Sequence, residues 1–244
     1  MKRYAILIQA PLSGRDELSG VSADIWGWKN FLMSLSGGAW NKDEIVILTN
    51  PSKVILDSAL ILAKYSDFSI VAFSGHGFAK KNALGFLETF VYINDSKDNP
   101  VVSEFDLNPG TPRCIVSLDC CRKVVTPRLT ESVTADFSET VSESVRSKYR
   151  AEYERQILMC EKGCTRLYSA SLDESASDQP SFTQIMMNYA QKWSADNPHK
   201  SMNVRDIMQI TAGLMIANGL KKQTPVYNGG RRLNHFPFIV GGGE

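Results

Sequence analysis

A histidine and a cysteine each follow an apolar run of the chain, in positions where their side chains could act together. His76 stands between two glycines, directly after the run at residues 70–73. Cys121 comes shortly after the next such run, at residues 114–118. Short apolar runs with branched residues are typical of strands that are buried on both faces. Two such strands ending at one sheet edge would bring a thiol nucleophile and an imidazole base together.

Each of these residues also has a simpler interpretation when it is taken alone. A Gly-His-Gly sequence can be a turn with a solvated histidine, and a cysteine after a strand is commonly a small buried hydrophobic residue. The occurrence of both His76 and Cys121 after consecutive predicted strands favours a catalytic pair. Cys120 is the alternative nucleophile, because alternation in an extended segment says only that neighbouring side chains diverge.

The elements that would position this pair alternate along the N-terminal part of the chain. Apolar runs at residues 4–8 and 45–48 predict two more strands. Ser22 and Ser52 predict the starts of two helices. The apolar faces of these helices comprise Ile25, Trp28, Phe31, Leu32 and Leu35 in the first, and Leu56, Leu60 and Ala63 in the second. Such alternation predicts a mainly parallel sheet with helices on both faces and functional residues at the carboxyl ends of its strands.

We expect one domain over residues 1–244, because a chain of 244 residues with 43% apolar content can bury one sizeable core. An insert at about residues 123–163 starts as a polar stretch and continues as a helix candidate, so we expect it to be mobile or partly helical. Regular structure then resumes with a strand at 167–170, helices at about 182–193 and 207–214, and a closing strand at 236–240.

Composition excludes several classes of protein. The 27 basic and 26 acidic residues give a net charge of +1, which favours neither nucleic acid nor an anionic membrane as a partner. The sequence shows neither a membrane-spanning run nor a signal-peptide pattern, which predicts a cytoplasmic protein. The odd number of cysteines favours reduced thiols over a disulfide framework; they are Cys114, Cys120, Cys121, Cys160 and Cys164.

The order of several short motifs resembles that of the caspases and metacaspases, in particular the compact orthocaspase-like chains of prokaryotes. These motifs lie at residues 4–8, 18–24, 73–77, 119–121, 167–171, 180–183 and 223–225. The resemblance covers nearly the whole chain and is weakest at residues 123–163. It implies a three-layer α/β/α sandwich with a six-stranded, mainly parallel central sheet.

The resemblance also assigns roles to the reactive residues. In caspases the histidine lies about 50 residues upstream of the cysteine, and the spacing of His76 and Cys121 is similar. Cys121, which completes the family pattern Asp-any-Cys, would attack the scissile carbonyl, and His76 would protonate the leaving amine. The backbone amides of Gly77 and Cys121 would form the oxyanion hole. Arg122 is a candidate to hold the thiolate. This chemistry needs no metal or organic cofactor; activation by calcium or by a partner protein is a separate hypothesis.

Two acids match the positions with which metacaspases select arginine or lysine. Asp24 and Asp119 would line the primary pocket and bind a guanidinium in bidentate geometry. As the alternative, Asp24 would face solvent on the first turn of its helix and Asp119 would cap a strand end. The residues after Cys121 depart from the metacaspase pattern, and Arg15 is the one candidate for the aspartate preference of true caspases.

Further polar residues resemble family features or have a structural alternative. Ser169 and Ser171, with Asp173 and Asp178, resemble the region that lines the substrate cleft. Cys160 and Cys164 could suggest a metal site, but lack of a second pair favours structural thiols. His199 and His235 have no predicted catalytic role. Self-cleavage in the insert is a hypothesis, with a solvated helix as the alternative; its basic residues are Arg128, Arg146, Lys148, Arg150, Arg155 and Lys162.

The function expected from these observations is that of a cysteine endopeptidase that cuts protein or peptide substrates after Arg or Lys. Specificity for Asp or Asn, as in caspases or legumain-like peptidases, is the alternative within the same chemistry. A catalytically silent caspase-like module that binds a partner is the alternative from another class. As a compact caspase-like chain, this sequence also resembles proteins that bacteria use in regulated cell death or in defence against phage.

Overall fold

The predicted α/β class is confirmed by the computed structural model, which describes residues 1–11, 18–82, 84–94, 101–122 and 142–242. Six strands form the central sheet in the order β10-β8-β7-β3-β1-β2. They are β1 Arg3–Ala10, β2 Ile45–Thr49, β3 Phe68–Gly75, β7 Arg113–Asp119, β8 Gly163–Tyr168 and β10 Val226–Asn228. The first five run parallel, and β10 is antiparallel to β8. The sheet is therefore mainly parallel, as the motifs implied.

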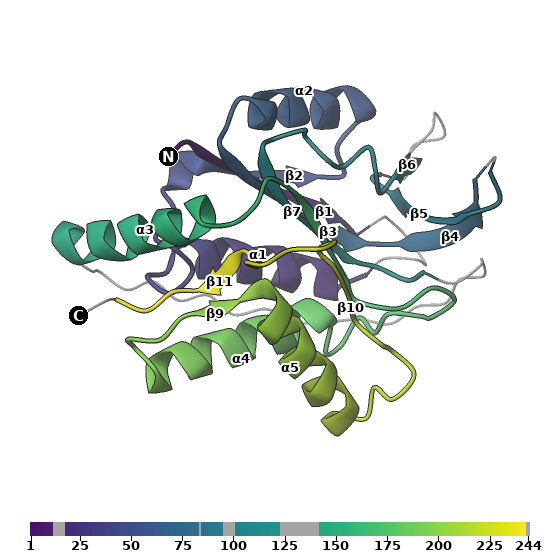
Figure 1. Cartoon of the computed structure of the whole chain (residues 1–244). Coiled ribbons are helices and arrows are strands. Elements are labelled where there is room, and N and C mark those ends of the chain that lie inside the picture. The colour runs from purple at the N-terminus through teal and green to yellow at the C-terminus, as the bar shows by residue number, and fades with distance from the viewer. Residues whose placement is uncertain (12–17, 83, 95–100, 123–141, 243–244) are drawn as a thin grey trace.

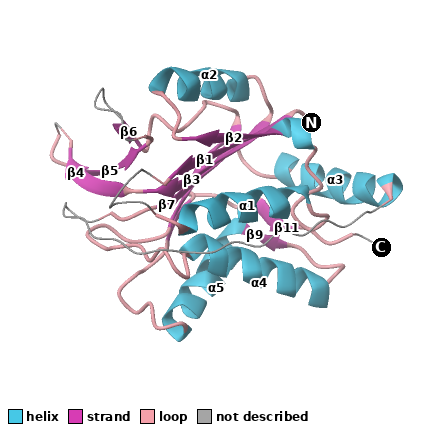
Figure 2. Cartoon of the chain, turned by 180° about the vertical axis from the view of Figure 1, so that it is seen from behind, coloured by secondary structure: helices cyan, strands magenta, loops and turns pink. Residues whose placement is uncertain are grey.

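Helices cover both faces of the sheet and complete three layers (Figures 1 and 2). Strand β3 lies in the interior of the sheet and is buried along its whole length. Its alternating side chains enter two separate cores, with Ile70 in one and Val71 in the other. The first core contains residues of α1 Gly20–Met33, α4 Phe182–Asp196 and α5 Val204–Ala217, and the second contains residues of α2 Lys53–Lys64.

The starts of the first two helices differ in how well the sequence predicts them. Ser52 caps α2, since its hydroxyl accepts a hydrogen bond from the backbone N–H of Ile55 at 3.3 Å. The prediction that Ser22 caps α1 is wrong, because α1 already begins at Gly20. A Cβ atom on Gly20 would lie 2.4 Å from the backbone oxygen of Asp178, so the contact with another loop requires glycine at this start.

Helix α3, Glu143–Leu158, lies within the predicted insert and is anchored in the core. Tyr153 and Ile157 are 1% and 0% exposed, so one side of this charge-rich helix is buried. Arg150 donates a hydrogen bond to Glu44 at 2.7 Å, in the short 3-10 helix η2, Lys42–Glu44. Residues 123–141 of the predicted insert lie outside the described part of the chain.

The predicted closing strand is present, but it lies outside the central sheet. Residues 237–239 form β11, Pro237–Ile239, but this strand pairs with β9, Met202–Asn203, and not with the central sheet. Phe238 instead stacks on Phe31 with ring centroids 4.8 Å apart, which fastens the segment to α1. The sixth strand of the central sheet is β10, which the sequence did not reveal. The strand predicted at residues 167–170 is β8 and begins earlier, at Gly163.

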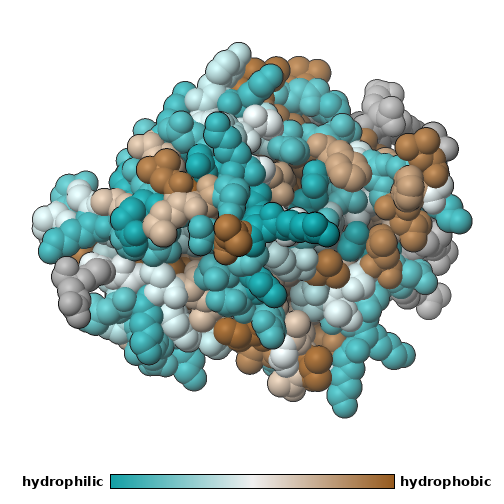
Figure 3. All heavy atoms as spheres, in the orientation of Figure 1, coloured by the Kyte–Doolittle hydropathy of each residue, from teal (hydrophilic) through white to brown (hydrophobic). Residues whose placement is uncertain are grey.

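A second unpredicted feature is a three-stranded antiparallel sheet directly after His76. It consists of β4 Gly77–Lys81, β5 Leu87–Tyr92 and β6 Val101–Ser103. Large hydrophobic side chains are exposed at its turn and beyond it, namely Leu84, Phe86, Leu87 and Phe105. Figure 3 shows hydrophobic side chains on the side of the molecule where β4 and β5 lie. Within the described residues, no helix is long and apolar enough to cross a membrane.

Candidate active site

The structure brings the His76 and Cys121 segments together at the carboxyl edge of the sheet. Strands β3 and β7 are parallel neighbours, and Ser74 at the end of β3 pairs with Asp119 at the end of β7. Each strand therefore delivers one reactive residue just beyond its last pairs. His76 is the single residue between β3 and β4, and its backbone oxygen accepts a hydrogen bond from Tyr92 N–H at 3.0 Å.

Gly77 fixes the approach of these two segments. A Cβ atom at this position would lie 2.6 Å from the Sγ of Cys120 and 3.0 Å from the backbone oxygen of Cys121. Real Cβ atoms essentially never come as close to another atom as the 2.6 Å to Cys120 Sγ, and a distance of 3.0 Å is shorter than most Cβ contacts. The absence of a side chain at Gly77 therefore lets the backbone after His76 lie against the backbone of Cys121.

The two neighbouring thiols have different environments. Cys120 is 2% exposed, and burial, followed by the charges of Cys121 and Asp119, raises the pKa of its thiol well above the ordinary value. Cys121 is only partly buried, and its Sγ accepts a hydrogen bond from the backbone N–H of Ala176 at 3.3 Å. A donor aimed at sulfur stabilises a thiolate. Cys121 is thus the better placed of the two to act as a nucleophile.

Arg122 does not take the place that the sequence suggested for it. Its guanidinium donates to the Thr89 hydroxyl at 2.9 Å and to the backbone oxygen of Ala170 at 3.1 Å. It also lies 4.0 Å from the centre of the Tyr168 ring, on which it stacks. These contacts direct the charge of Arg122 into the interior between β5 and β8. They fasten the strand end to the small sheet rather than hold the Cys121 thiolate.

Asp24 and Asp119 lie side by side beneath the site, at the first turn of α4. Asp24 accepts hydrogen bonds from the hydroxyl of Ser74 at 2.6 Å and from Gln184 Nε2 at 3.2 Å, and it also accepts from the Ser181 hydroxyl. Asp119 accepts from the backbone N–H of Thr183 at 2.9 Å. With exposed fractions of 2% and 5%, both carboxyls are buried, so the alternative in which Asp24 faces solvent is wrong.

A third acid joins this pair. Burial, and then the charge of Asp119, raises the pKa of Asp24 well above its ordinary value, and Asp178 adds to this rise. Burial likewise raises the pKa of Asp119 to about 6, against the opposing hydrogen bonds from Thr183 and Ser169. Asp178 is only half-buried, and its oxygen accepts from Gly20 N–H at 3.2 Å. Burial raises the pKa of Asp178 too, while the nearby charge of His76 lowers it.

The two predicted cleft serines take different positions. Ser169 is completely buried, and its hydroxyl accepts from Cys120 N–H at 3.1 Å and bonds to the Cys120 oxygen at 3.2 Å. Its side chain therefore supports the cysteine segment from below and does not face a substrate, which corrects the prediction. Ser171 is half-buried and donates to the backbone oxygen of Thr224 at 3.1 Å.

Two residues to which the sequence assigned no role, Glu174 and the motif residue Gln223, hold the loop around Cys121. Glu174 accepts from the backbone N–H groups of Ser171 at 3.0 Å and Thr224 at 2.7 Å. Gln223 is 5% exposed, accepts from Ser177 N–H at 2.8 Å and donates to the Ser169 oxygen at 3.0 Å. Single glutamates and glutamines give no sequence signal for such a role, because their partners are backbone groups distant along the chain.

The remaining sequence candidates lie apart from the site or outside the described residues. Among the described residues, no group of three or more His, Cys, Asp or Glu could hold a metal ion. The thiol of Cys160 donates to the Gln156 oxygen at 3.3 Å. Cys164 lies opposite Cys114 in the register of the parallel strands β8 and β7, and both are free thiols. Arg15 and Arg128 belong to the part of the chain that is not described.

Comparisons with known proteins agree with the architecture. No protein-family model matches the sequence, and no curated protein matches it. Among solved structures, caspase-1 of Spodoptera frugiperda is similar with a TM-score of 0.56 and 10% identity, over 100% of this chain and 90% of that one. A protein of Geobacter sulfurreducens is similar with a TM-score of 0.60 and 13% identity, over 99% of this chain and 100% of that one. The fold is therefore caspase-like.

Proposed function

We propose that this protein is a cysteine endopeptidase in which Cys121 is the nucleophile and His76 the proton carrier. The observation that carries the proposal is the close approach of Gly77 to the Cys120 side chain and the Cys121 backbone oxygen, just beyond the ends of the parallel neighbours β3 and β7. The caspase-like fold supports it. The half-buried thiol with a backbone donor supports Cys121 over the buried Cys120.

The proposed reaction follows from these positions. The Cys121 thiolate attacks the carbonyl carbon of the scissile bond, and the negative charge that develops on oxygen is stabilised by the amides of Gly77 and Cys121. His76 in its protonated form gives a proton to the leaving amine, and a thioester with Cys121 remains. His76 then takes a proton from water, whose oxygen attacks the thioester and releases the acid product and the thiolate. In each cycle His76 thus gives one proton to the leaving amine and takes one back from water.

The acidic cluster supports a preference for Arg, and less strongly Lys, before the cut. The charges of Asp119 and Asp178 raise the pKa of Asp24, and the charge of Asp178 raises the pKa of Asp119, so the three carboxyl groups lie close together. No ion pair of any of the three with a basic residue occurs among the described residues. A substrate guanidinium would relieve this repulsion, whereas a substrate aspartate would increase it. Asp178 is the most exposed of the three and would meet the substrate first.

The test uses purified wild-type protein, Cys121→Ala and Cys120→Ala, each with peptides that release a fluorophore after Arg, Lys, Asp or Asn, with and without calcium. We expect release after Arg by the wild type and by Cys120→Ala, and none by Cys121→Ala. A peptidyl chloromethyl ketone ending in Arg should alkylate Cys121 with loss of chloride, as seen by peptide mass spectrometry.

Each other result has a defined meaning. Release after Asp alone would overturn the acidic pocket while keeping the catalytic pair. Activity that survives Cys121→Ala and disappears in Cys120→Ala would move the nucleophile to Cys120. A wild-type protein that cleaves no peptide and takes no label under either condition would contradict the peptidase proposal and favour a binding module.

A further inference from the structure

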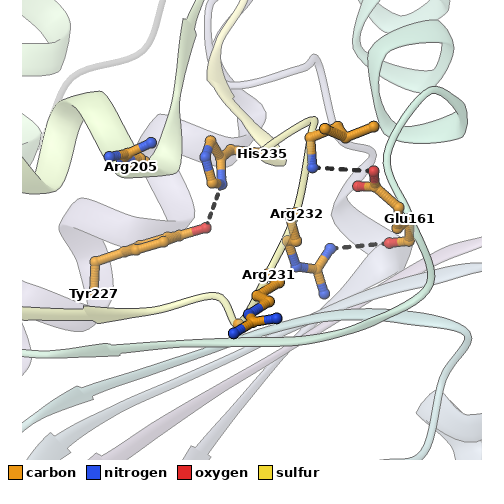
Figure 4. Close-up of a pocket in the computed structure, with 8 residues that line it drawn as sticks. Glu161, Arg205, Tyr227, Arg231, Arg232 and His235 are labelled. Carbon is orange, nitrogen blue, oxygen red and sulfur yellow. Dashed lines mark hydrogen bonds between the residues drawn. The ribbon is translucent and has the colours of Figure 1, made fainter.

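A second site lies at the opposite end of the sheet from Cys121. A cavity of about 550 Å³ opens beside the start of β8 and the end of β10 (Figure 4). This size lies within the range of about 300–1,000 Å³ that is usual for sites of small ligands. The residues that line it are Glu161, Arg205, Tyr227, Gly230, Arg231, Arg232, Leu233 and His235.

The lining carries an excess of positive charge. Three arginines face one carboxylate, that of Glu161, which already accepts hydrogen bonds from the backbone N–H of Leu233 at 3.1 Å and of Asn234 at 3.4 Å. Within the described residues, none of the three guanidiniums has a carboxylate within ion-pair distance. With three arginines and one glutamate, the described lining therefore keeps a net positive charge.

The cations differ in how firmly they are held. Arg232 is fixed: it donates to the Gly229 oxygen at 2.7 Å and to the Glu161 oxygen at 2.9 Å, and it lies 4.5 Å from the centre of the Phe236 ring. Arg205 and Arg231 are exposed, and no hydrogen bond of their guanidiniums to the described residues occurs. A fixed cation thus lies beside two that are able to turn towards a ligand.

Tyr227 and His235 add a polar wall. The Tyr227 hydroxyl and His235 Nδ1 are 2.6 Å apart. In the neutral tautomer in which Nδ1 accepts a hydrogen bond from the hydroxyl, Nε2 carries the ring hydrogen. Burial, and after it the charge of Arg205, lowers the pKa of His235, which favours this neutral form. The N-terminus of α5 is not available to a ligand, because Asn203 already caps the N–H groups of Arg205 and Asp206 at 2.9 and 3.0 Å.

We propose that this cavity binds a small phosphate-bearing ligand of nucleotide size through Arg205, Arg231 and Arg232. Guanidinium groups match the oxygens of a phosphate in bidentate geometry, and a phosphate with two negative charges can accept from several of them at once. Leu233, which is 91% exposed, and the ring of Tyr227 offer apolar surface beside the cations. The site is independent of the peptidase proposal.

The test is calorimetric titration of the wild type with ATP, with inorganic pyrophosphate and with sodium sulfate, each at about 50 mM salt. We expect ATP or pyrophosphate to bind with a dissociation constant below about 1 mM, and sulfate to bind more weakly. Tighter binding of ATP than of pyrophosphate would identify a nucleotide site, and the reverse would identify an inorganic polyphosphate site.

A matched pair of variants locates the binding. Arg205→Gln combined with Arg231→Gln removes two charges from the cavity, and Lys221→Gln combined with Lys222→Gln removes two exposed charges that do not line it. We expect the first pair to weaken binding at least about tenfold, and the second to change it less than about twofold. Equal weakening by both pairs would show a general charge effect and overturn the site. A dissociation constant above about 1 mM for both ATP and pyrophosphate, a binding free energy weaker than about −4 kcal/mol, would overturn it as well.

Discussion

Gly77 contacts Cys120 so closely that a Cβ atom at position 77 would lie 2.6 Å from the Cys120 Sγ and 2.9 Å from its Cβ. The segment that follows β3 and the segment that follows β7 therefore meet through a glycine and a small buried thiol. A larger residue at either position would push the two reactive side chains apart. Substitution of Gly77 therefore tests whether this contact positions the proposed catalytic pair.

Gly77→Ala is expected to lower kcat/KM for the Arg peptide at least about a hundredfold, since misplacement of reacting groups by about 1 Å can cost that much. Because the neighbours of the new methyl group include the Cys120 Cβ and the Cys121 backbone oxygen, the segments must shift to admit it, and a melting curve checks that the variant is folded. Gly213→Ala is the control: it lies in α5 with nothing within 4 Å of the new Cβ and should leave activity unchanged. An active Gly77→Ala enzyme would show that this contact does not position the pair.

The position of this pair was predictable because it depends on local signals. Residues 70–73 and 114–118 are apolar enough to be recognised as buried strands, and parallel neighbours end at the same edge. The contacts of residues that follow the strands could not be predicted from the sequence. Arg122 looks like a cation beside the nucleophile in the sequence, but its contacts with Thr89 and Tyr168 come from segments whose approach only the folded chain defines.

The features of the fold that the sequence did not reveal have the same origin. Strand β10 has three residues, between Pro225 and Gly229, and it is a strand only because β8 offers a free edge. Residues 236–240 have the stronger strand pattern, yet Phe238 packs against the rings of α1. Burial of charged groups was also hidden: the sequence places Asp24 on an amphipathic helix, and only the contact with α4 shows that its carboxyl is enclosed.

Asp119→Asn should separate specificity from stability. Because the pKa of Asp119 is raised to about 6, the folded protein binds its proton more tightly than the unfolded chain does. Ionisation of this buried group therefore destabilises the fold as pH rises from about 4 to 6. The variant keeps an oxygen to accept from Thr183 N–H and lacks the charge. Its melting temperature at pH 8 should be about 3–6 °C above that of the wild type, and the difference should shrink at pH 4.

The same variant should lose selectivity for Arg. We expect kcat/KM for the Arg peptide to fall about tenfold or more at pH 8, while the rate at which iodoacetamide alkylates Cys121 stays within about twofold, since a neutral pocket loses a charge-assisted contact of roughly 1.5–3 kcal/mol. In the wild type, cleavage after Arg should weaken as pH falls below about 6, where Asp119 becomes neutral. An unchanged Arg preference together with a raised melting temperature would show that the charge of Asp119 lowers the stability of the fold and has no role in the pocket.

Gln223 connects the loop after β8 with the segment that enters β10, and it provides a test of how the Cys121 thiolate is held. Gln223→Leu removes both the acceptor for Ser177 N–H, in a partly buried bond, and the donor to the Ser169 oxygen, in a buried one. The loop should then hold Ala176, whose N–H donates to Cys121 Sγ, less firmly. Because an unsatisfied buried partner costs about 1–3 kcal/mol, the melting temperature should fall by several degrees.

A purely structural role would change the melting temperature alone, so the decisive measurement is the pH dependence of Cys121 alkylation by iodoacetamide. We expect the midpoint of this dependence to move to higher pH in Gln223→Leu, because a weaker Ala176 donor stabilises the thiolate less, and kcat/KM to fall with it. Lys222→Leu, an exposed neighbour, serves as the control and should leave the midpoint in place. If Gln223→Leu is destabilised but reacts with the same midpoint as the wild type, the thiolate depends on groups other than the Ala176 amide.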